Sequence, residues 1–369
     1  MLLIICFFVW TKIKPMRKEK RNKILTILLF AQIGLVYLLS KFPYFIENNY
    51  SNGIYKPMSA FFRTIYGAVP FSIGDLIYLS LMILIIRFLY KLITSKNKKK
   101  LVYGFLAGLS VFYFAFYFFW GLNYSRLPLT NSLELEKESY DIENLRAFTD
   151  TLLTNISKLQ LQTTGSDSLP VVVPYTKNEI IKLTNIGYEN LSKKFEQFEY
   201  RPTSLKKSLF SLPLTYMGFA GYLNPLTGEA QVDYLIPKVT LPMTCSHEVA
   251  HQLGIASESE ANFIGFLAAS LHPDPYFQYS ANLLALRYAL SDIYRFDPEL
   301  YETYIEKLPK GVMINIKELQ EFWLKYKNPA EPLFKAFYNN YLLLNQQEDG
   351  LESYNKMVDL LIAYHHKYL

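Results

Sequence analysis

The stretch HEVAHQLGIASESEAN, residues 247–262, gathers side chains that could bind a metal ion and move protons. On a helix, His247 and His251 project from the same face one turn apart, so both imidazoles can reach a single ion. Glu248 flanks that face, where it is too offset to bind the ion but is placed to take a proton from a metal-bound water. This HExxH pattern predicts the chemistry of a zinc hydrolase.

The residues around the pattern favour a helix rather than a loop. Val249, Ala250 and Leu253 supply an apolar face, and Gly254 is a plausible C-terminal stop. A polar helix with two surface or capping histidines is the alternative that the sequence leaves open.

A zinc ion needs a third protein ligand, and two glutamates compete for that role. In the pattern HExxHxxGxxH the third ligand is a histidine six residues after the second one, but here that position is Ser257. The run ESEAN fits instead the ExxAN pattern of zinc sites with a glutamate ligand, which makes Glu258 the third ligand. Asn262, four residues later on the same helical face, could hydrogen-bond a ligand histidine. Glu260 is the rival ligand, although Ser257 and Glu260 also form an S-x-x-E capping-box pattern that would explain Glu260 structurally.

The other histidines and the cysteines do not suggest a second site. His272 lies in the loop-like run LHPDP, and His365 and His366 lie near a helical C-terminus, where positive charge is tolerated. The two cysteines, Cys6 and Cys245, imply no disulfide framework. Among 30 tyrosines, of which Tyr279 and Tyr288 are examples, the sequence does not single out an oxyanion donor.

The first 122 residues hold most of the apolar character of the chain and predict a membrane anchor. Residues 24–40 and 101–122 are uncharged runs of 17 and 22 residues, long enough to span a bilayer. Residues 71–90 predict a third span, although one acidic and one basic residue interrupt it near its ends. Residues 1–10 are apolar but too short to span, and the basic run that follows them argues against a cleavable signal peptide.

The basic residues predict the orientation of these spans. Seven lysines and arginines lie in residues 12–23, five lie in residues 91–100, and few lie between the first two spans. Positive residues stay on the cytoplasmic side, so the N-terminus is predicted inside and everything after Leu122 outside. The net charge of +6 follows the same distribution, which argues for contact with a lipid bilayer and against a nucleic-acid partner.

The part beyond the spans reads as a linker, residues 123–141, followed by a mainly α-helical domain, residues 142–369. Apolar residues recur at helical spacing over 142–161, and Thr176 with Glu179 forms a capping-box pattern that begins a helix running to about Phe195. The chain after the motif is predicted to be helical to its end, with breaks near residues 273–275, 297–298, 309–311 and 329–332.

Two segments before the motif are not helical in pattern. Proline, glycine and threonine cluster over residues 211–230 and predict a loop. Residues 231–236 alternate and predict a half-exposed strand that could align an extended substrate by strand addition. The predicted fold class is therefore an α-helical membrane anchor of about three spans plus a mainly α, α+β, zincin-like outer domain.

The motifs also carry a family resemblance. HEVAH followed by ESEAN resembles the gluzincin group of zinc peptidases, and the chain resembles a family of bacterial membrane proteins called domain of unknown function 3810. The features shared with that family are the leading spans and the runs TYMGFAGYLNPLTGEA, LPMTCSHEVAHQLG and SESEANFIGFLA. The resemblance covers most of the chain and implies a zinc-peptidase-like site but no substrate. Only six residues separate His251 from Glu258, fewer than in most gluzincins, so Gly254 would have to allow a sharp reversal.

These observations together predict a membrane-anchored zinc metallopeptidase that hydrolyses peptide bonds in a peptide or protein substrate. One Zn²⁺ per chain would be held by His247, His251 and Glu258, with Glu248 as the general base, outside the bacterial cytoplasmic (inner) membrane. The motif lies over 120 residues past the last predicted span, so we expect hydrolysis outside the bilayer rather than within it. The alternative function is a non-catalytic, zinc-stabilised envelope or receptor-like membrane protein, which would have no use for a general base at Glu248.

Overall fold

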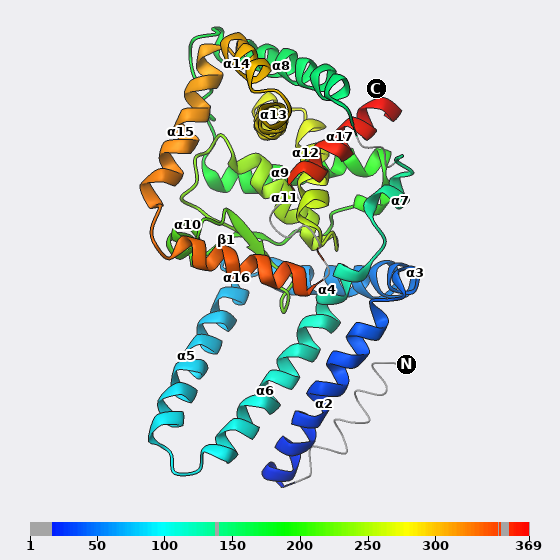
Figure 1. Cartoon of the computed structure of the whole chain (residues 1–369), viewed down its shortest axis with the longest axis vertical. Coiled ribbons are helices and arrows are strands. Elements are labelled where there is room, and N and C mark those ends of the chain that lie inside the picture. Colours follow the sequence, from blue (N-terminus) through cyan, green and yellow to red (C-terminus); the bar gives the residue numbers. More distant parts are fainter. Residues whose placement is uncertain (1–16, 137–139, 346, 348–353, 369) are drawn as a thin grey trace.

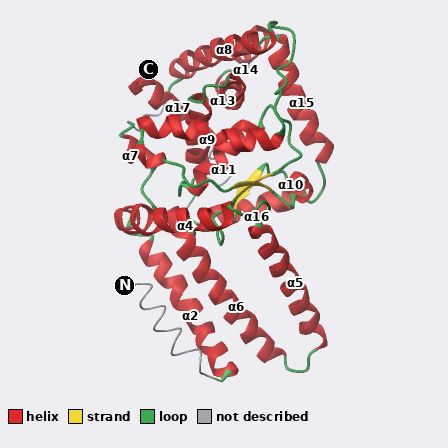
Figure 2. Ribbon diagram, turned by 180° about the vertical axis from the view of Figure 1, so that it is seen from behind, coloured by secondary structure: helices red, strands yellow, loops and turns green. Residues whose placement is uncertain are grey.

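Three long helices extend from one side of a larger helical body in the computed structural model (Figure 1). These helices are α2 (Lys18–Leu39), α5 (Ile73–Thr94) and α6 (Lys98–Phe119). One small sheet lies within the body, on the side that faces the three helices (Figure 2). The structure describes residues 17–136, 140–345, 347 and 354–368, so the apolar residues 1–10 lie outside the described part.

The remaining elements follow in chain order. They are α3 (Pro43–Phe45), the π-helix η1 (Ile46–Tyr55), α4 (Lys56–Gly67), the 3-10 helix η2 (Gly121–Ser125), α7 (Leu129–Leu133), α8 (Ile142–Thr164), α9 (Lys177–Lys194), the 3-10 helix η3 (Glu196–Phe198), β1 (Leu205–Lys207), α10 (Ser211–Met217), β2 (Gly221–Leu223), β3 (Ala230–Val232), α11 (Leu241–Gln252), α12 (Glu258–Ser270), α13 (Pro275–Phe296), α14 (Pro298–Lys307), α15 (Lys310–Tyr326), α16 (Glu331–Leu344) and α17 (Tyr354–Tyr368).

The helices α2, α5 and α6 are long and apolar enough to cross a membrane, as the sequence predicts. Each has 22 residues, and their mean hydropathies are 1.8, 2.1 and 1.8. A helix of that length spans about 33 Å, which matches a hydrocarbon core of about 30 Å. The boundaries differ from the predicted ones: α2 begins earlier because lysines and arginines extend the helix beyond its apolar run, and α6 ends at Phe119, where a 3-10 turn follows.

The end of α5 that meets the body is anchored there by two buried carboxylates. Asp75, in the first turn of α5, accepts hydrogen bonds from the backbone N–H of Leu209, at 2.6 Å, and from the hydroxyl of Tyr222. Glu229 accepts from the backbone N–H of Gly74 at 2.6 Å. A carboxylate at a helix N-terminus also interacts favourably with the helix dipole. Asp75, the acidic residue that interrupts the span predicted over residues 71–90, is therefore buried in protein rather than exposed to lipid.

A segment between the first two spans, residues 46–67, packs beneath α11; we call it the junction segment. The hydroxyls of Tyr55 and Ser59 donate to the carbonyl of Gln252 at 3.0 and 2.9 Å. The guanidinium of Arg63 donates to the same carbonyl at 3.3 Å and to that of Pro202 at 2.8 Å. Carbonyls in the last turn of a helix have no partner within the helix. The junction segment therefore caps the C-terminal end of α11.

The main hydrophobic core of the body lies between α8, α9, α12, α13 and α17 and confirms the predicted helical stripe. Helix α8 buries one face against this core, with Leu145, Phe148, Leu152, Ile156 and Leu159 all buried. The predicted capping box is also present, because the Thr176 side chain accepts from the N–H of Glu179 while the Glu179 carboxylate accepts from the N–H of Thr176.

The small sheet has the strand order β1-β3-β2, with β3 parallel to β1 and antiparallel to β2. The predicted strand over residues 231–236 is wrong in length and exposure, because β3 ends at Val232 and the side chains of Gln231 and Asp233 are fully buried. Asp233 is held by the hydroxyl of Thr215 at 2.6 Å and the N–H of Leu235 at 2.8 Å. Because both edges of β3 are already paired, strand addition to it is excluded, and β2 is an edge strand.

The secondary structure predicted before the motif is wrong, whereas the helix breaks predicted after the motif are confirmed. The loop predicted over residues 211–230 is wrong, because that range contains α10 and β2. Gly218 ends α10 with a φ of +79°, so the glycine reflects a helix end rather than an extended loop. After the motif, the four predicted breaks are confirmed by the starts of α13, α14, α15 and α16.

Candidate metal centre

Helix α11 carries both histidines of the motif, and local sequence fixes its two ends. Pro242 lies in its first turn, where the missing N–H breaks no helical hydrogen bond. Gly254 has a φ of +85°, which confirms the predicted stop and the sharp reversal. A Cβ on Gly254 would also approach the ring of Tyr55 to 2.9 Å. The chain therefore turns back directly after the second histidine.

Helix α12 begins at Glu258 and packs closely against α11 through Gly265. A Cβ on Gly265 would lie 2.8 Å from the backbone nitrogen of His247 and 3.0 Å from its Cα. Only glycine permits this approach of the two backbones. The short connection and the close packing together bring the first residue of α12 beside the histidine face of α11.

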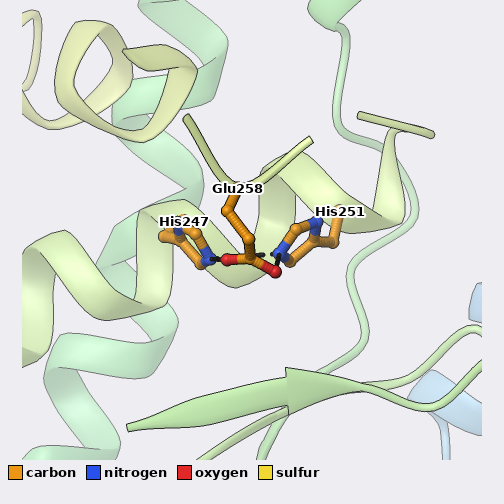
Figure 3. A group of neighbouring side chains, drawn as sticks. All are labelled: His247, His251 and Glu258. Carbon is orange, nitrogen blue, oxygen red and sulfur yellow. Dashed lines mark hydrogen bonds and ion pairs between the residues drawn. The ribbon is translucent and has the colours of Figure 1, made fainter. Parts of the chain in front are cut away.

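The side chains of His247, His251 and Glu258 converge on one point (Figure 3). The Nε2 atoms of the two histidines are 3.0 Å apart. The Glu258 oxygens lie 3.3 Å from Nε2 of His247 and 3.6 Å from Nε2 of His251. One ligand atom from each residue lies within 4.8 Å of the other two. Two imidazole nitrogens and one carboxylate oxygen are a typical ligand set for zinc.

The surroundings of the histidines are consistent with metal ligation through Nε2. Nδ1 of His251 lies 2.7 Å from the carbonyl of Ile255, a contact that places its proton on Nδ1 and leaves the Nε2 lone pair free. Nδ1 of His247 is buried without a partner among the described residues. Asn262, which the sequence predicts as a hydrogen-bond partner of a ligand histidine, makes no hydrogen bond to either histidine in the part of the chain that the structure describes.

The charges at this point also suit a bound cation. Burial lowers the pKa of the His251 imidazole, but the neighbouring carboxylates of Glu258 and Glu248 outweigh burial and raise that pKa to about 9. Burial acts to raise the pKa of Glu258, yet the two imidazoles hold it well below its usual range. With these pKa values the imidazole of His251 holds a proton whose charge balances the carboxylate of Glu258 when no cation is bound. A divalent ion bound to these side chains would displace that proton.

Glu248 lies beside the three converging side chains and is buried. Burial raises the pKa of its carboxyl group to about 7, with a further contribution from Glu258, while the two histidines act in the opposite direction. Its Oε2 atom has no hydrogen-bond partner among the described residues. A buried carboxylate oxygen without a partner is costly, and a pKa near neutrality is what general acid–base catalysis requires.

The structure separates the two candidate glutamates. Oε1 of Glu260 accepts a hydrogen bond from the backbone N–H of Leu129 at 2.7 Å. Glu260 therefore binds the first turn of α7 and is not one of the side chains that converge at the candidate centre. The capping box predicted between Ser257 and Glu260 is wrong, because Ser257 makes no side-chain cap and its hydroxyl instead lies 3.0 Å from that of Ser259. Glu258 is the glutamate that meets the histidines.

A large cavity of about 1550 Å³ contains the candidate centre. Glu248 and Glu258 line it, together with the edge strand β2. Gly221 of β2 lies so close to Glu248 that a Cβ would approach the Glu248 Oε1 atom to 2.5 Å. The edge strand and the carboxylate therefore form adjacent parts of one cavity wall.

One residue of this site was not found from the sequence. The hydroxyl of Tyr338, on α16, donates to Oε1 of Glu258 at 2.6 Å. It lies 80 residues after Glu258, and no local pattern marks it among the tyrosines. Tyr279 does not line the cavity and donates instead to Asn315 at 2.9 Å, whereas Tyr288 does line the cavity.

Replacing Gly265 with alanine is expected to weaken the centre. The added Cβ would meet backbone atoms of His247 that no side-chain rotation can move, so α11 and α12 must separate by a few tenths of an ångström. We expect a loss of about 1–3 kcal/mol of stability and a lower zinc affinity. Thermal unfolding and competition with a chelator measure the two effects. Gly108→Ala is the matched control, because no atom of the described residues lies within 4 Å of its added Cβ. A similar loss in both variants would contradict this account.

The comparisons with known proteins place the chain in a family. A family model described as "Protein of unknown function (DUF3810)" matches residues 50–362, which include most of the junction segment, two of the three apolar helices and the candidate centre. No curated protein and no solved structure matches the chain. Because the match covers most of the sequence, the chain belongs to the family of proteins of unknown function DUF3810.

Proposed function

We propose that this chain is a membrane-anchored zinc metallopeptidase that hydrolyses peptide bonds at the outer surface of the bacterial cytoplasmic membrane. The observation that carries the proposal is the convergence of His247, His251 and Glu258 next to Glu248, on the wall of the same cavity. One oxygen of the buried Glu248 carboxylate has no partner within the described part of the chain. Such a combination of metal ligands and a group with a raised pKa is typical of a hydrolytic site. The basic residues near the span ends support a cytoplasmic N-terminus and an outer body.

Three side chains bind the metal ion in the proposed reaction, and a fourth transfers the proton. His247, His251 and Glu258 would hold the zinc ion, which supplies Lewis-acid chemistry by lowering the pKa of water and polarising a carbonyl. Glu248 accepts the proton from the attacking water and then passes it to the leaving amine. The pKa of about 7 suits both steps, because the carboxyl can take up and release a proton near neutral pH.

The edge strand β2 supports a peptide substrate. Its residues Gly221 and Tyr222 line the cavity, and β2 pairs with β3 on one side only among the described strands. An extended peptide that adds to an edge strand gains backbone hydrogen bonds and lies in a fixed direction. The close approach of Gly221 to Glu248 would bring such a peptide beside the general base.

Tyr338 is proposed to donate a hydrogen bond to the negative charge that develops on the substrate carbonyl oxygen. Tyr338→Phe is expected to lower kcat by about 100-fold, with KM and zinc content little changed. Steady-state kinetics and metal analysis on the full chain measure these quantities. Tyr288→Phe is the control from the same cavity. A fall in zinc content in Tyr338→Phe, with kcat per bound zinc unchanged, would show that Tyr338 only positions Glu258.

A non-catalytic zinc site remains the competing function. A purely structural site would be satisfied by its ligands and would have no reason to keep a second, unpaired carboxylate buried beside them. The buried oxygen of Glu248 therefore favours the enzyme.

An unbiased comparison of envelope peptides tests the proposed function. Bacterial cells carrying the native chain are compared with cells carrying Glu248→Gln, and the cleaved peptides are identified by mass spectrometry. We expect a set of new peptide termini that appears only with native Glu248 and that is lost on zinc chelation. Identical peptide termini in both strains, with the protein present in equal amounts, would exclude a peptidase.

A further inference from the structure

The cavity that contains the metal centre continues between the membrane-spanning helices. Its walls include Ile33 of α2, Met82 of α5 and Phe112 of α6, as well as the ligands of the candidate centre. Trp120 follows α6 by one residue, and its indole N–H donates to the carbonyl of His251 at 3.3 Å. The candidate centre therefore lies at the outer end of α6, although the two residues are 131 positions apart.

The membrane part of the cavity has the shape of a wedge. Near the short loop that joins α5 and α6, Phe88 and Phe105 stack with ring centroids 4.4 Å apart, which closes the helix pair there. Toward the body, Met82 of α5 and Tyr113 of α6 line the cavity instead. Figure 1 shows α5 and α6 as separate rods below the body. The helix pair is thus closed at its loop end and open beneath the candidate centre.

The rim of this opening is apolar. Met82, Phe337 and Leu344 line the cavity, yet 48%, 75% and 82% of their surfaces are exposed. Phe337 and Leu344 belong to α16, which lies across the outer ends of the spans and also carries Tyr338 (Figure 1). Such a rim is unfavourable in water but is suited to the hydrocarbon and headgroup boundary of a bilayer.

Two basic side chains, Arg287 and Lys335, also line this cavity. Lys335 forms an ion pair with the carboxylate of Glu331 at 2.5 Å. The guanidinium of Arg287, on α13, makes no hydrogen bond or ion pair with another residue in the described ranges 17–136, 140–345, 347 and 354–368. A guanidinium binds carboxylates strongly when water is partly excluded. The cavity thus combines an apolar opening toward the bilayer with a free positive charge.

We propose that the substrate is a lipid-anchored peptide. Its hydrocarbon chain enters the wedge between α5 and α6 from the bilayer, and an acidic group on its peptide part pairs with Arg287. The scissile bond of such a substrate then lies beside Glu248. This inference rests on the proposed peptidase function and names its substrate class.

The wedge favours a hydrocarbon chain over a transmembrane polypeptide. A spanning helix is about 10–12 Å wide over about 30 Å of bilayer, whereas the wedge closes at Phe88, about 9 Å along α5 from Met82. An extended polypeptide in the wedge would leave backbone amides unpaired in an apolar space. A hydrocarbon chain has no polar groups that need a partner, and it is thin enough to enter the narrow end of the wedge.

Paired peptides test the substrate class on the full chain in lipid nanodiscs. The probe is a degenerate library of short peptides, each made with and without a palmitoyl chain. We expect kcat/KM to be at least about tenfold higher for the acylated members. The reason is that binding energy from a remote part of the substrate can offset the cost of orienting the scissile bond at the reacting centre. Met82→Trp, which fills the wedge, should bring this ratio close to one. Leu84→Trp is the matched control and should keep the ratio, because Leu84 is on the same helix but does not line the cavity.

Two further arms identify what occupies the cavity. Arg287→Gln should reduce the preference for acidic members of the library without changing the effect of the palmitoyl chain. A third set of peptides carries an apolar transmembrane segment in place of the palmitoyl chain. Faster cleavage of this third set, or equal cleavage of acylated and unacylated peptides, would overturn the proposal.

Photocrosslinking separates this inference from the proposed function, because it needs no turnover. An acylated peptide with a photoreactive group on its acyl chain is incubated with the Glu248→Gln chain, and the labelled residues are mapped by mass spectrometry. Labels confined to the facing sides of α5 and α6 would support the wedge even if no peptide were hydrolysed, in which case only the peptidase function would fail. Labels spread evenly over the lipid-facing sides of all three spans would overturn the inference and leave the peptidase function standing.

Discussion

Glu248→Gln is expected to slow hydrolysis strongly while leaving zinc bound. Glutamine has nearly the shape of glutamate but cannot accept a proton, and Glu248 is not among the three converging ligands. General acid–base catalysis contributes about 10²–10⁴-fold to a rate, so kcat should fall by about that factor. Steady-state kinetics with the full chain in detergent, combined with metal analysis of the same sample, measure both quantities.

The stability of the same variant provides its internal control. Oε2 of Glu248 is buried without a partner among the residues that the structure describes, and an uncharged amide is less costly to bury than a carboxylate. We therefore expect the thermal midpoint of Glu248→Gln to equal or exceed that of the native chain, as is common when a functional group is removed from an active site. Activity that persists in the variant at a native level would remove the general base from the account. A lower thermal midpoint would show that Glu248 supports the fold instead.

Glu258→Ala and Glu260→Ala are expected to have opposite effects on zinc and on folding. Loss of Glu258 removes one of the three ligands, so zinc affinity should fall by more than the roughly 10–100-fold expected for an outer-shell residue. Loss of Glu260 removes the hydrogen bond to the N–H of Leu129 but leaves the three ligands in place. That variant should keep its zinc and lose about 1–2 kcal/mol of stability.

Chelator competition and thermal unfolding distinguish these two glutamates. The native chain and Glu260→Ala should bind zinc with the same affinity, and Glu258→Ala should bind it far more weakly. If Glu260→Ala lost the zinc and Glu258→Ala kept it, the ligand assignment would have to be reversed. Equal zinc affinity in all three proteins would mean that neither glutamate is a ligand.

The parts of this structure that follow short periodic patterns could be predicted from sequence. The spans depend on uncharged runs of about 20 residues, and the face of α8 depends on apolar residues at helical spacing. The proximity of Glu258 to the two histidines could also be predicted, because the HExxH and ExxAN spacings and the turn at Gly254 are all local. Local spacing fixes which side chains share a helical face.

The parts that depend on distant contacts could not be predicted. Strands of three residues, such as β2 and β3, are too short to show a period, and their burial is decided by neighbouring strands. Glu260 finds its partner at Leu129, 131 residues earlier, so a local capping pattern gave the wrong answer. The hydrogen bond from Tyr338 to Glu258 and the contact of Trp120 with His251 likewise join segments that no sequence pattern connects.

The position of the candidate centre relative to the spans also could not be predicted, because it depends on distant contacts. Its distance from the last span along the chain predicts hydrolysis outside the bilayer, but it does not predict how close to the spans the site lies. In the structure the chain returns, so that Tyr55, Ser59 and Arg63 of the junction segment cap the end of α11. The helix that carries both histidines is therefore capped by residues that lie between two helices apolar enough to span a membrane.

The zinc X-ray absorption spectrum of the purified full chain tests the central claim most directly. We expect one zinc ion per chain, with two imidazole nitrogens and only oxygen atoms besides them in its ligand shell, and with the imidazole signal lost in His247→Ala. A chain that takes up no zinc, or a spectrum with sulfur ligands or without imidazole, would contradict the assignment of His247, His251 and Glu258 as a metal centre.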